Sequence, residues 1–252
     1  MHTMRRGAVV VTVISALLRG SEPCVAQEWP MHSLERPKPR VVNPGPPGPP
    51  VPPPADAIVL FDGRDLTRWR AANGGAARWK VENGYFEVAP GAGTLASADS
   101  FGDVQVHIEW MAPSPPKGES QDRGNSGVFL MGQYEVQVLD SYRSDTYADG
   151  QAGALYGQFP PLVNASRPPG EWQSYDIVFR APRFDSAGTV LRPARMTVLH
   201  NNVLIHDNVE LVGPTSHRER RPYVRHADRL PITLQDHAHP VRYRNVWVRA
   251  LD

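Results

Sequence analysis

From residue 55 to the C-terminus, apolar and polar residues alternate with a period of two, and this pattern limits the fold more than any other feature of the chain. A period of two is typical of strands that are buried on one side. In residues 104–110, for example, every second residue is apolar. Asn83 and Gly84 separate two such stretches, and they favour a tight hairpin because both residue types tolerate positive φ.

Similar stretches recur at residues 134–140, 172–179, 196–200, 203–209, 232–237 and 241–248, and no helical periodicity competes with them in length. About ten short strands separated by turn residues are typical of two packed antiparallel sheets. We therefore predict an all-β fold, a two-sheet antiparallel β-sandwich or jelly roll. Such a fold does not specify a chemistry, so function must be argued from the polar residues on the strand faces.

The N-terminal part of the chain has a different composition. Arg5 and Arg6 precede an apolar stretch at residues 7–18, and small residues follow near Ala26, which predicts a signal peptide over residues 1–27. Anchoring in a membrane and lipidation of Cys24 are the alternatives. Eleven of the 25 residues from Pro30 to Pro54 are Pro, which predicts a Pro-rich linker over residues 28–54 and a folded domain over 55–252. The protein is then expected to be exported, either periplasmic or secreted.

Charge and cysteine content exclude several classes of function. Charged residues make up 21% of the chain and the formal net charge is +1, so no basic stripe is available to bind nucleic acid. The apolar stretch at residues 7–18 is too short for a membrane-spanning helix. A single Cys excludes an intramolecular disulfide and a Cys-based zinc site.

Polar side chains on the predicted strands are the candidates for a binding or catalytic site, because motifs for phosphate, dinucleotide and zinc binding are absent from the sequence. Glu135 and Gln137 share one strand face, and Gln235 and His237 share another. Taken singly, each of these residues could instead be an ordinary solvent-exposed polar residue on the surface of a sheet, with no functional role. The further candidates are Asp140 at a strand end, Arg244 on the last strand, Arg123 and Asn125 in a turn-rich loop, and His107 with Glu109.

Seven short motifs, in order along the chain, resemble the 3-keto-disaccharide hydrolase domain family. They are LFDGRDL (60–66) followed by Trp69, NSGVFL (125–130), YEVQVLD (134–140), GALYG (153–157), WQSYD (172–176), LQDH (234–237) and YRNV (243–246). The resemblance implies a jelly roll like that of concanavalin-type lectins and glucanases. It also implies an exported bacterial protein that acts on glycosides oxidised at carbon 3, a substrate that an upstream sugar 3-dehydrogenase would supply.

Carried over to this sequence, the resemblance implies a site built from the polar residues of these motifs. The catalytic residues would be Glu135, Asp140, His237 and Arg244, and the substrate-binding residues Arg123, Asn125, Gln137, Tyr156 and Gln235, with His107 and Glu109 on the same polar face. Ala238 stands where the family usually has Gly, and Met131 where some relatives have Arg or Gln.

The implied chemistry is reasonable on physical grounds. A ketone at carbon 3 acidifies the proton on carbon 2, so a base can remove this proton and the resulting enolate can expel the substituent on carbon 1. Either His237 or Glu135 would be the base, and the other the acid or a metal ligand. Arg244 or a divalent cation would stabilise the enolate. A non-catalytic carbohydrate-binding module and a retaining glucanase are the alternatives, although Gln137 replaces the central acid of the glucanase strand.

Overall fold

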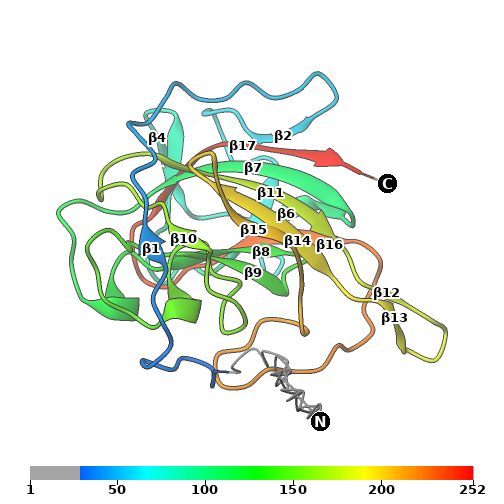
Figure 1. Cartoon of the computed structure of the whole chain (residues 1–252). Coiled ribbons are helices and arrows are strands. Elements are labelled where there is room, and N and C mark those ends of the chain that lie inside the picture. The colour runs from blue at the N-terminus through cyan, green and yellow to red at the C-terminus, as the bar shows by residue number, and fades with distance from the viewer. Residues whose placement is uncertain (1–28, 252) are drawn as a thin grey trace, which may run out of the picture.

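The computed structural model describes residues 29–251, so the expected signal peptide lies outside the described residues. Nearly all regular structure is β, and the helical elements in the described range are two 3₁₀ turns, η1 (Ser120–Asp122) and η2 (Ala148–Gly150). No described helix is long and apolar enough to cross a membrane. Two antiparallel sheets dominate the domain, which confirms the predicted β-sandwich (Figure 1).

The larger sheet has eight strands. In spatial order these are β15 (Val203–Glu210), β14 (Arg195–His200), β11 (Gln173–Arg180), β7 (Val104–Met111), β17 (Arg242–Ala250), β5 (Tyr85–Glu87) and β4 (Lys80–Glu82), and β2 (Ile58–Phe61) also pairs with β17. The β4–β5 hairpin turns at Asn83 and Gly84, with φ of 47° and 78°, as their sequence predicted.

The smaller sheet has five strands, in the order β3 (Trp69–Ala71), β6 (Leu95–Phe101), β16 (Leu230–Leu234), β8 (Ser126–Leu130) and β9 (Tyr134–Val138). Two small pairs complete the structure, β1 (Arg40–Val41) with β10 (Val163–Asn164) and β12 (Arg183–Phe184) with β13 (Val190–Arg192). The strand predicted over residues 232–237 ends early, at Leu234, where Gln235 N–H still donates to the Gly127 carbonyl and Asp236 turns away to the Gly93 amide.

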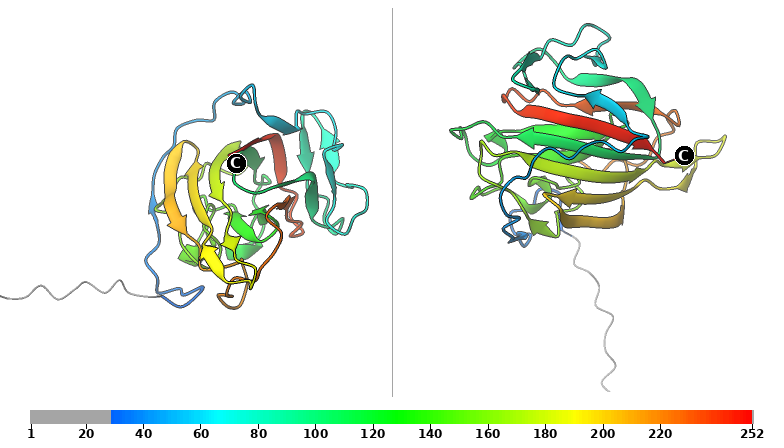
Figure 2. Two further views of the ribbon diagram at one scale, coloured as in Figure 1. Left: turned by 90° about the vertical axis from the view of Figure 1, so that its right-hand side faces the viewer. Right: turned by 90° about the horizontal axis from the view of Figure 1, so that it is seen from above.

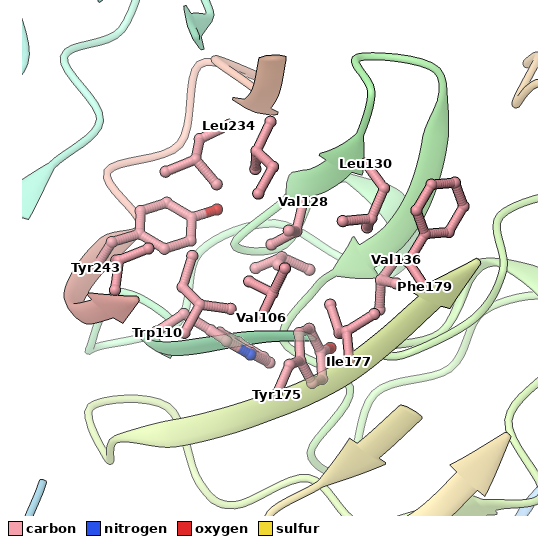
Figure 3. Packing of buried hydrophobic residues seen from close by; sticks show 14 of the residues in the cluster. Val106, Trp110, Val128, Leu130, Val136, Tyr175, Ile177, Phe179, Leu234 and Tyr243 are labelled. Atoms are coloured by element: carbon pink, nitrogen blue, oxygen red, sulfur yellow. The ribbon is translucent and has the colours of Figure 1, made fainter. Parts of the chain in front are cut away.

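One hydrophobic core lies between the two sheets. Figure 3 shows Val106, Trp110 and Ile177 of the larger sheet facing residues of the smaller one, among them Val128 and Val136. Because alternate residues of a strand point to opposite faces, the polar partners on both sheets point away from this core. Each sheet therefore has its own outer face, and the two outer faces lie on opposite sides of the sandwich.

Residues 29–54, here called the N-terminal strap, run along the outside of the domain (Figure 2). β1 pairs in parallel with β10, the Arg167 guanidinium donates to the Gly45 carbonyl at 2.9 Å, and the Asn245 amide donates to the Val51 carbonyl at 2.8 Å. The stretch expected to be a spacer is thus docked on the domain. Side chains of the domain donate hydrogen bonds to the backbone carbonyls of the strap. A Pro-rich segment can still accept such bonds, because proline lacks only the backbone N–H donor and keeps its carbonyl.

Candidate active site

A cavity of about 240 Å³ lies on the outer face of the smaller sheet. β9 supplies Glu135 and Gln137, Asn125 immediately precedes β8, and Gln235 and His237 immediately follow β16. These strands are neighbours in the order β16–β8–β9, so these five residues predicted from the sequence come together at one place, and a sixth, Tyr156, joins them from a loop. Loops complete the lining with Tyr156, Thr215, Ser216 and His217, and Phe129 lies on β8.

Glu135 is the most unusual group in this cavity. Glu135 is only 4% exposed, and this burial raises the pKa of its carboxyl to about 8. Gly127 on the neighbouring strand makes room for it, because a Cβ at that position would lie 2.5 Å from Glu135 Oε1. The Glu135 backbone N–H donates to the Thr215 hydroxyl at 3.0 Å, which ties the strand to the loop above it.

Gln137 connects the carboxyl to a second layer of polar groups. With its amide nitrogen turned toward β8, Gln137 donates to the Ser126 carbonyl at 2.9 Å and to Glu135 Oε1 at 3.1 Å. In the opposite orientation the same nitrogen donates to Gln121 Oε1 at 3.0 Å, and Gln121 itself donates to the Thr146 hydroxyl at 2.8 Å. The carboxyl of Glu135 is therefore held by neutral hydrogen-bonding groups.

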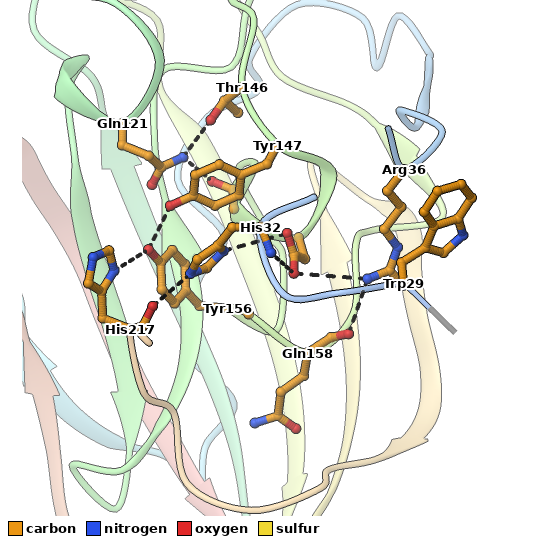
Figure 4. Close-up of polar contacts among 12 residues, drawn as sticks. Trp29, His32, Arg36, Gln121, Thr146, Tyr147, Tyr156, Gln158 and His217 are labelled. Atoms are coloured by element: carbon orange, nitrogen blue, oxygen red, sulfur yellow. Dashed lines mark hydrogen bonds and ion pairs between the residues drawn. The ribbon is translucent and has the colours of Figure 1, made fainter. Parts of the chain in front are cut away.

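The mouth of the cavity carries two imidazoles. His237 is exposed and stacks on His239, with ring centroids 5.9 Å apart, and His239 lies 3.1 Å from the Asp122 carboxylate. His217 is also exposed, and its Nδ1 lies 3.1 Å from the Tyr156 hydroxyl, which also contacts the Tyr147 hydroxyl at 2.7 Å (Figure 4). The buried carboxyl and the exposed His237 thus lie at different depths of one pocket.

Asp140 and Arg123 face one another beside the cavity and are not part of its lining. Arg123 Nε donates to Asp140 Oδ2 at 2.7 Å, and Asp140 Oδ1 accepts from the Tyr142 N–H. Burial raises the pKa of Asp140 in spite of this ion pair. The pair fixes the end of β9 against the loop that carries Asn125.

The structure does not bring Arg244, His107 and Glu109 to the cavity, contrary to the expectation of one shared polar face. They lie on β17 and β7, on the outer face of the larger sheet, where Arg244 Nε donates to Glu109 Oε2 at 2.6 Å and stacks on Trp172. The reason is that alternation identifies the outward residues of each strand, and cannot tell to which sheet a strand belongs.

His107 is the centre of a charged cluster on that face. Its Nδ1 lies 2.7 Å from the Asp176 carboxylate and its Nε2 3.6 Å from Glu109, and its ring stacks on Trp247. Burial acts to lower the pKa of His107, but the hydrogen bonds to Asp176 and Glu109 outweigh it and raise the pKa to about 9. This cluster joins strands β7, β11 and β17 through its side chains.

Four lining residues were not identified from the sequence: Phe129, Thr215, Ser216 and His217. Phe129 falls within a quoted motif, whereas the other three lie in an irregular connection between β15 and β16 that shows no alternation. Only the spatial position of this connection, over the end of β9, reveals its contribution.

Within residues 29–251, no three side chains of His, Cys, Asp or Glu converge closely enough to hold a metal ion. Glu135 and His237 were the expected ligands, and both line the cavity. The divalent cation therefore stays a prediction.

The described residues form a β-sandwich with a small polar pocket on the outer face of the smaller sheet, and comparison with known proteins identifies the family. Residues 56–249 match the family described as the 3-keto-alpha-glucoside-1,2-lyase-like domain, and the chain belongs to this family. The 3-keto-disaccharide hydrolase of Bacteroides thetaiotaomicron is 24% identical over 79% of this chain and 81% of its own length.

Solved structures agree with this assignment. A protein of Parabacteroides distasonis, provisionally named a glycosyl hydrolase, is 43% identical and superimposes with a TM-score of 0.76, covering 81% of this chain and 94% of its own. A second protein of that organism with the same provisional name is 18% identical, with a TM-score of 0.59 over 78% of this chain and 94% of its own, and shows the fold alone.

Proposed function

We propose that this protein cleaves glycosides that are already oxidised at carbon 3, by removing the proton on carbon 2 and eliminating the substituent on carbon 1. One observation carries the proposal: in the part of the chain that the structure describes, Glu135 is the single carboxylate lining the pocket. A retaining glycosidase needs two carboxyl groups about 5 Å apart around the scissile bond. The second acid of the same motif, Asp140, is paired with Arg123 instead.

The depth of each group suggests its role. A sugar ring in the pocket would lie against Glu135, while its carbon 1 substituent would leave through the mouth beside His237. Glu135 in its carboxylate form takes the carbon 2 proton, and the electron pair of the C2–H bond forms an enolate with its charge on the carbon 3 oxygen. As the ketone re-forms, the bond from carbon 1 to the leaving oxygen breaks, and His237 gives that oxygen a proton.

The product of this elimination is a 2-hydroxy-3-keto-glycal, with a double bond between carbons 1 and 2. Addition of water at carbon 1 and return of a proton to carbon 2 give the 3-keto sugar, so the sum of the two steps is hydrolysis. Glu135 gains a proton in the first step and exchanges it with the water that enters for the second step, so it is placed to protonate carbon 2. The same carboxyl then acts as base and acid in turn.

The enolate needs hydrogen-bond donors now that Arg244 lies on the opposite face. The side-chain amide of Gln235 lines the cavity and makes no hydrogen bond to any described residue, so it is available to a ligand. Asn125 and Tyr156 line the same space. Fixed neutral donors in a site that excludes water stabilise a developing oxyanion without reorganisation. The cavity is smaller than the roughly 300–1,000 Å³ of drug-sized ligand sites, which suits one sugar ring.

The experiment is a comparison of three proteins on a 3-keto-glucoside and on the same glucoside unoxidised. We expect the wild type to cleave only the oxidised substrate, and Glu135→Gln to lower kcat/KM by about 10²–10⁴. Glu210→Gln is the matched control, because Glu210 pairs with Arg195 on the exposed surface of β15, and it should stay within about twofold. Wild-type rates in Glu135→Gln, or equal cleavage of the unoxidised glucoside, would refute the proposal.

The proposed substrate also implies a partner reaction. A sugar ketone at carbon 3 must come from oxidation of the corresponding alcohol, so a sugar 3-dehydrogenase acting upstream is part of the proposal. Residues 1–27 support export of the chain, and we propose that it works in the periplasm or outside the cell. Detecting the processed protein in a periplasmic or culture fraction tests this placement, and its retention in the cytoplasm would contradict it.

A further inference from the structure

The N-terminal strap reaches the wall of the active-site pocket, although the family match begins only at residue 56. Figure 4 shows His32 of the strap lying against Tyr147 and Tyr156, close to His217. Its ring centroid is 4.2 Å from that of Tyr147, 5.1 Å from Tyr156 and 5.6 Å from His217. A residue outside the family domain therefore packs directly on two residues that line the cavity.

Hydrogen bonds fix this contact at both ends. His32 Nε2 lies 2.9 Å from the His217 carbonyl, and the His32 backbone N–H donates to Asp149 Oδ2 at 3.1 Å. Asp149 is fully buried, and apart from the strap no cation pairs with it within the described range. Burial acts to raise the pKa of Asp149, but the hydrogen bonds from His32 outweigh it and lower the pKa.

Neighbouring strap residues hold the same two loops. Arg36 donates to the Gln158 carbonyl at 3.4 Å, and the Met31 side chain packs on Gly157, where a Cβ would lie 2.8 Å from Met31 Cε. Arg220 then joins the Gly157 carbonyl to the Trp29 carbonyl. The strap thus lies between residues 147–158 and residues 212–220, the loops that supply Tyr156, Thr215, Ser216 and His217 to the pocket.

We infer that His32 is a positioning residue of the active site, which holds Tyr156 and His217 in place for the sugar. It does not line the cavity and so has no direct part in the chemistry. Its removal should leave the β-sandwich intact, because the core between the sheets does not include it. What should change is the arrangement of one wall of the pocket, and with it the binding of substrate.

The test compares His32→Ala, His32→Gln and the control Leu34→Ala, a strap residue that is 72% exposed. For turnover of a 3-keto-glucoside, a readout that rests on the proposed function, we expect His32→Ala to raise KM about tenfold with kcat within about threefold. His32→Gln should recover most of the loss, since its amide can donate to the His217 carbonyl. Leu34→Ala should match the wild type.

Hydrogen exchange followed by mass spectrometry supplies a readout that needs no turnover. His32→Ala should speed exchange in peptides covering 147–158 and 212–220, and leave β7 and β11 unchanged. His32→Phe keeps the ring without the hydrogen bond to His217, so it should fold even if His32→Ala does not, and should show faster exchange in 212–220. Unchanged exchange and KM in the His32 variants, or equal effects in Leu34→Ala, would overturn the inference.

The two proposals can fail separately. A wild-type protein that turns over no 3-keto-glucoside would refute the proposed function, while the exchange measurement would still decide whether His32 holds the two loops. Normal turnover with no response to any His32 variant would refute the inference alone.

Discussion

Glu135→Gln should make the protein more stable at alkaline pH while lowering its kcat/KM by about 10²–10⁴. In the folded protein burial raises the pKa of the Glu135 carboxyl from its ordinary value of 4.5 to about 8. The unfolded chain leaves the carboxyl in water, so it loses its proton there near pH 4.5. Between these two values the folded state binds more protons than the unfolded state, and stability falls as pH rises.

The size of the effect follows from the same two pKa values. Each pH unit between them costs about 1.4 kcal/mol, so the free energy of unfolding should lose about 2 kcal/mol by pH 6 and about 5 kcal/mol above pH 8. Below pH 4.5 there is no cost. Gln is neutral at every pH and nearly the same shape as Glu, so the variant should escape this loss.

Urea unfolding of both proteins at pH 5, 7 and 9 measures the difference. Contributions from other groups cancel in it, among them buried His200, whose pKa burial lowers to about 3. We expect the variant to gain stability relative to wild type as pH rises, reaching several kcal/mol at pH 9. A difference that stays constant between pH 5 and pH 9 would show that Glu135 is not desolvated, and the argument for its role as a base would fail.

Three further predictions concern the pH dependence of catalysis, the larger sheet and the loop after β16. If Glu135 is the base, kcat/KM should rise with pH and level off above about pH 8, as its pKa requires, and a rate that falls from pH 7 to 9 would instead make it the acid. Arg244→Ala should lower the free energy of unfolding by about 2 kcal/mol, because it removes one charged partner of the nearly buried Glu109 carboxylate while His107 and Asn245 stay, and it should leave kcat unchanged. A hundredfold loss of kcat there would return Arg244 to the active site. Ala238→Gly should raise the free energy of unfolding by about 0.5–1 kcal/mol, because Ala238 has a φ of 62°, which Gly adopts without strain. The midpoint of thermal unfolding should therefore rise slightly, and a lower midpoint would contradict this.

The sequence predicted most of the fold because alternation reports burial directly. The Asn83–Gly84 hairpin and the strands around Val106 and Val136 follow from local patterns that the structure keeps. Ala238 has a positive φ of 62°, a conformation that favours Gly, the residue that the family resemblance led us to expect at this position.

The candidate site was predicted only in part. Glu135, Gln137 and Gln235 could be placed together because the motifs that carry them lie on neighbouring strands. Arg244 carries the same kind of signal, an outward polar residue in a family motif, yet it belongs to the other sheet. His217 and the docked strap have no periodic signal, and their positions depend on contacts between residues far apart in the sequence, such as His32 with Asp149.

The incorporation of deuterium at carbon 2 of the sugar product is the measurement that tests the central claim most directly. The wild type should be given a 3-keto-glucoside in deuterated water, and the sugar product should be analysed by mass spectrometry and proton magnetic resonance at short reaction times, with non-enzymatic exchange measured in a control without protein. Removal and return of the carbon 2 proton predict one deuterium at carbon 2 of the product, formed at a rate that Glu135→Gln abolishes. Cleavage with the original hydrogen retained at carbon 2 would contradict the account.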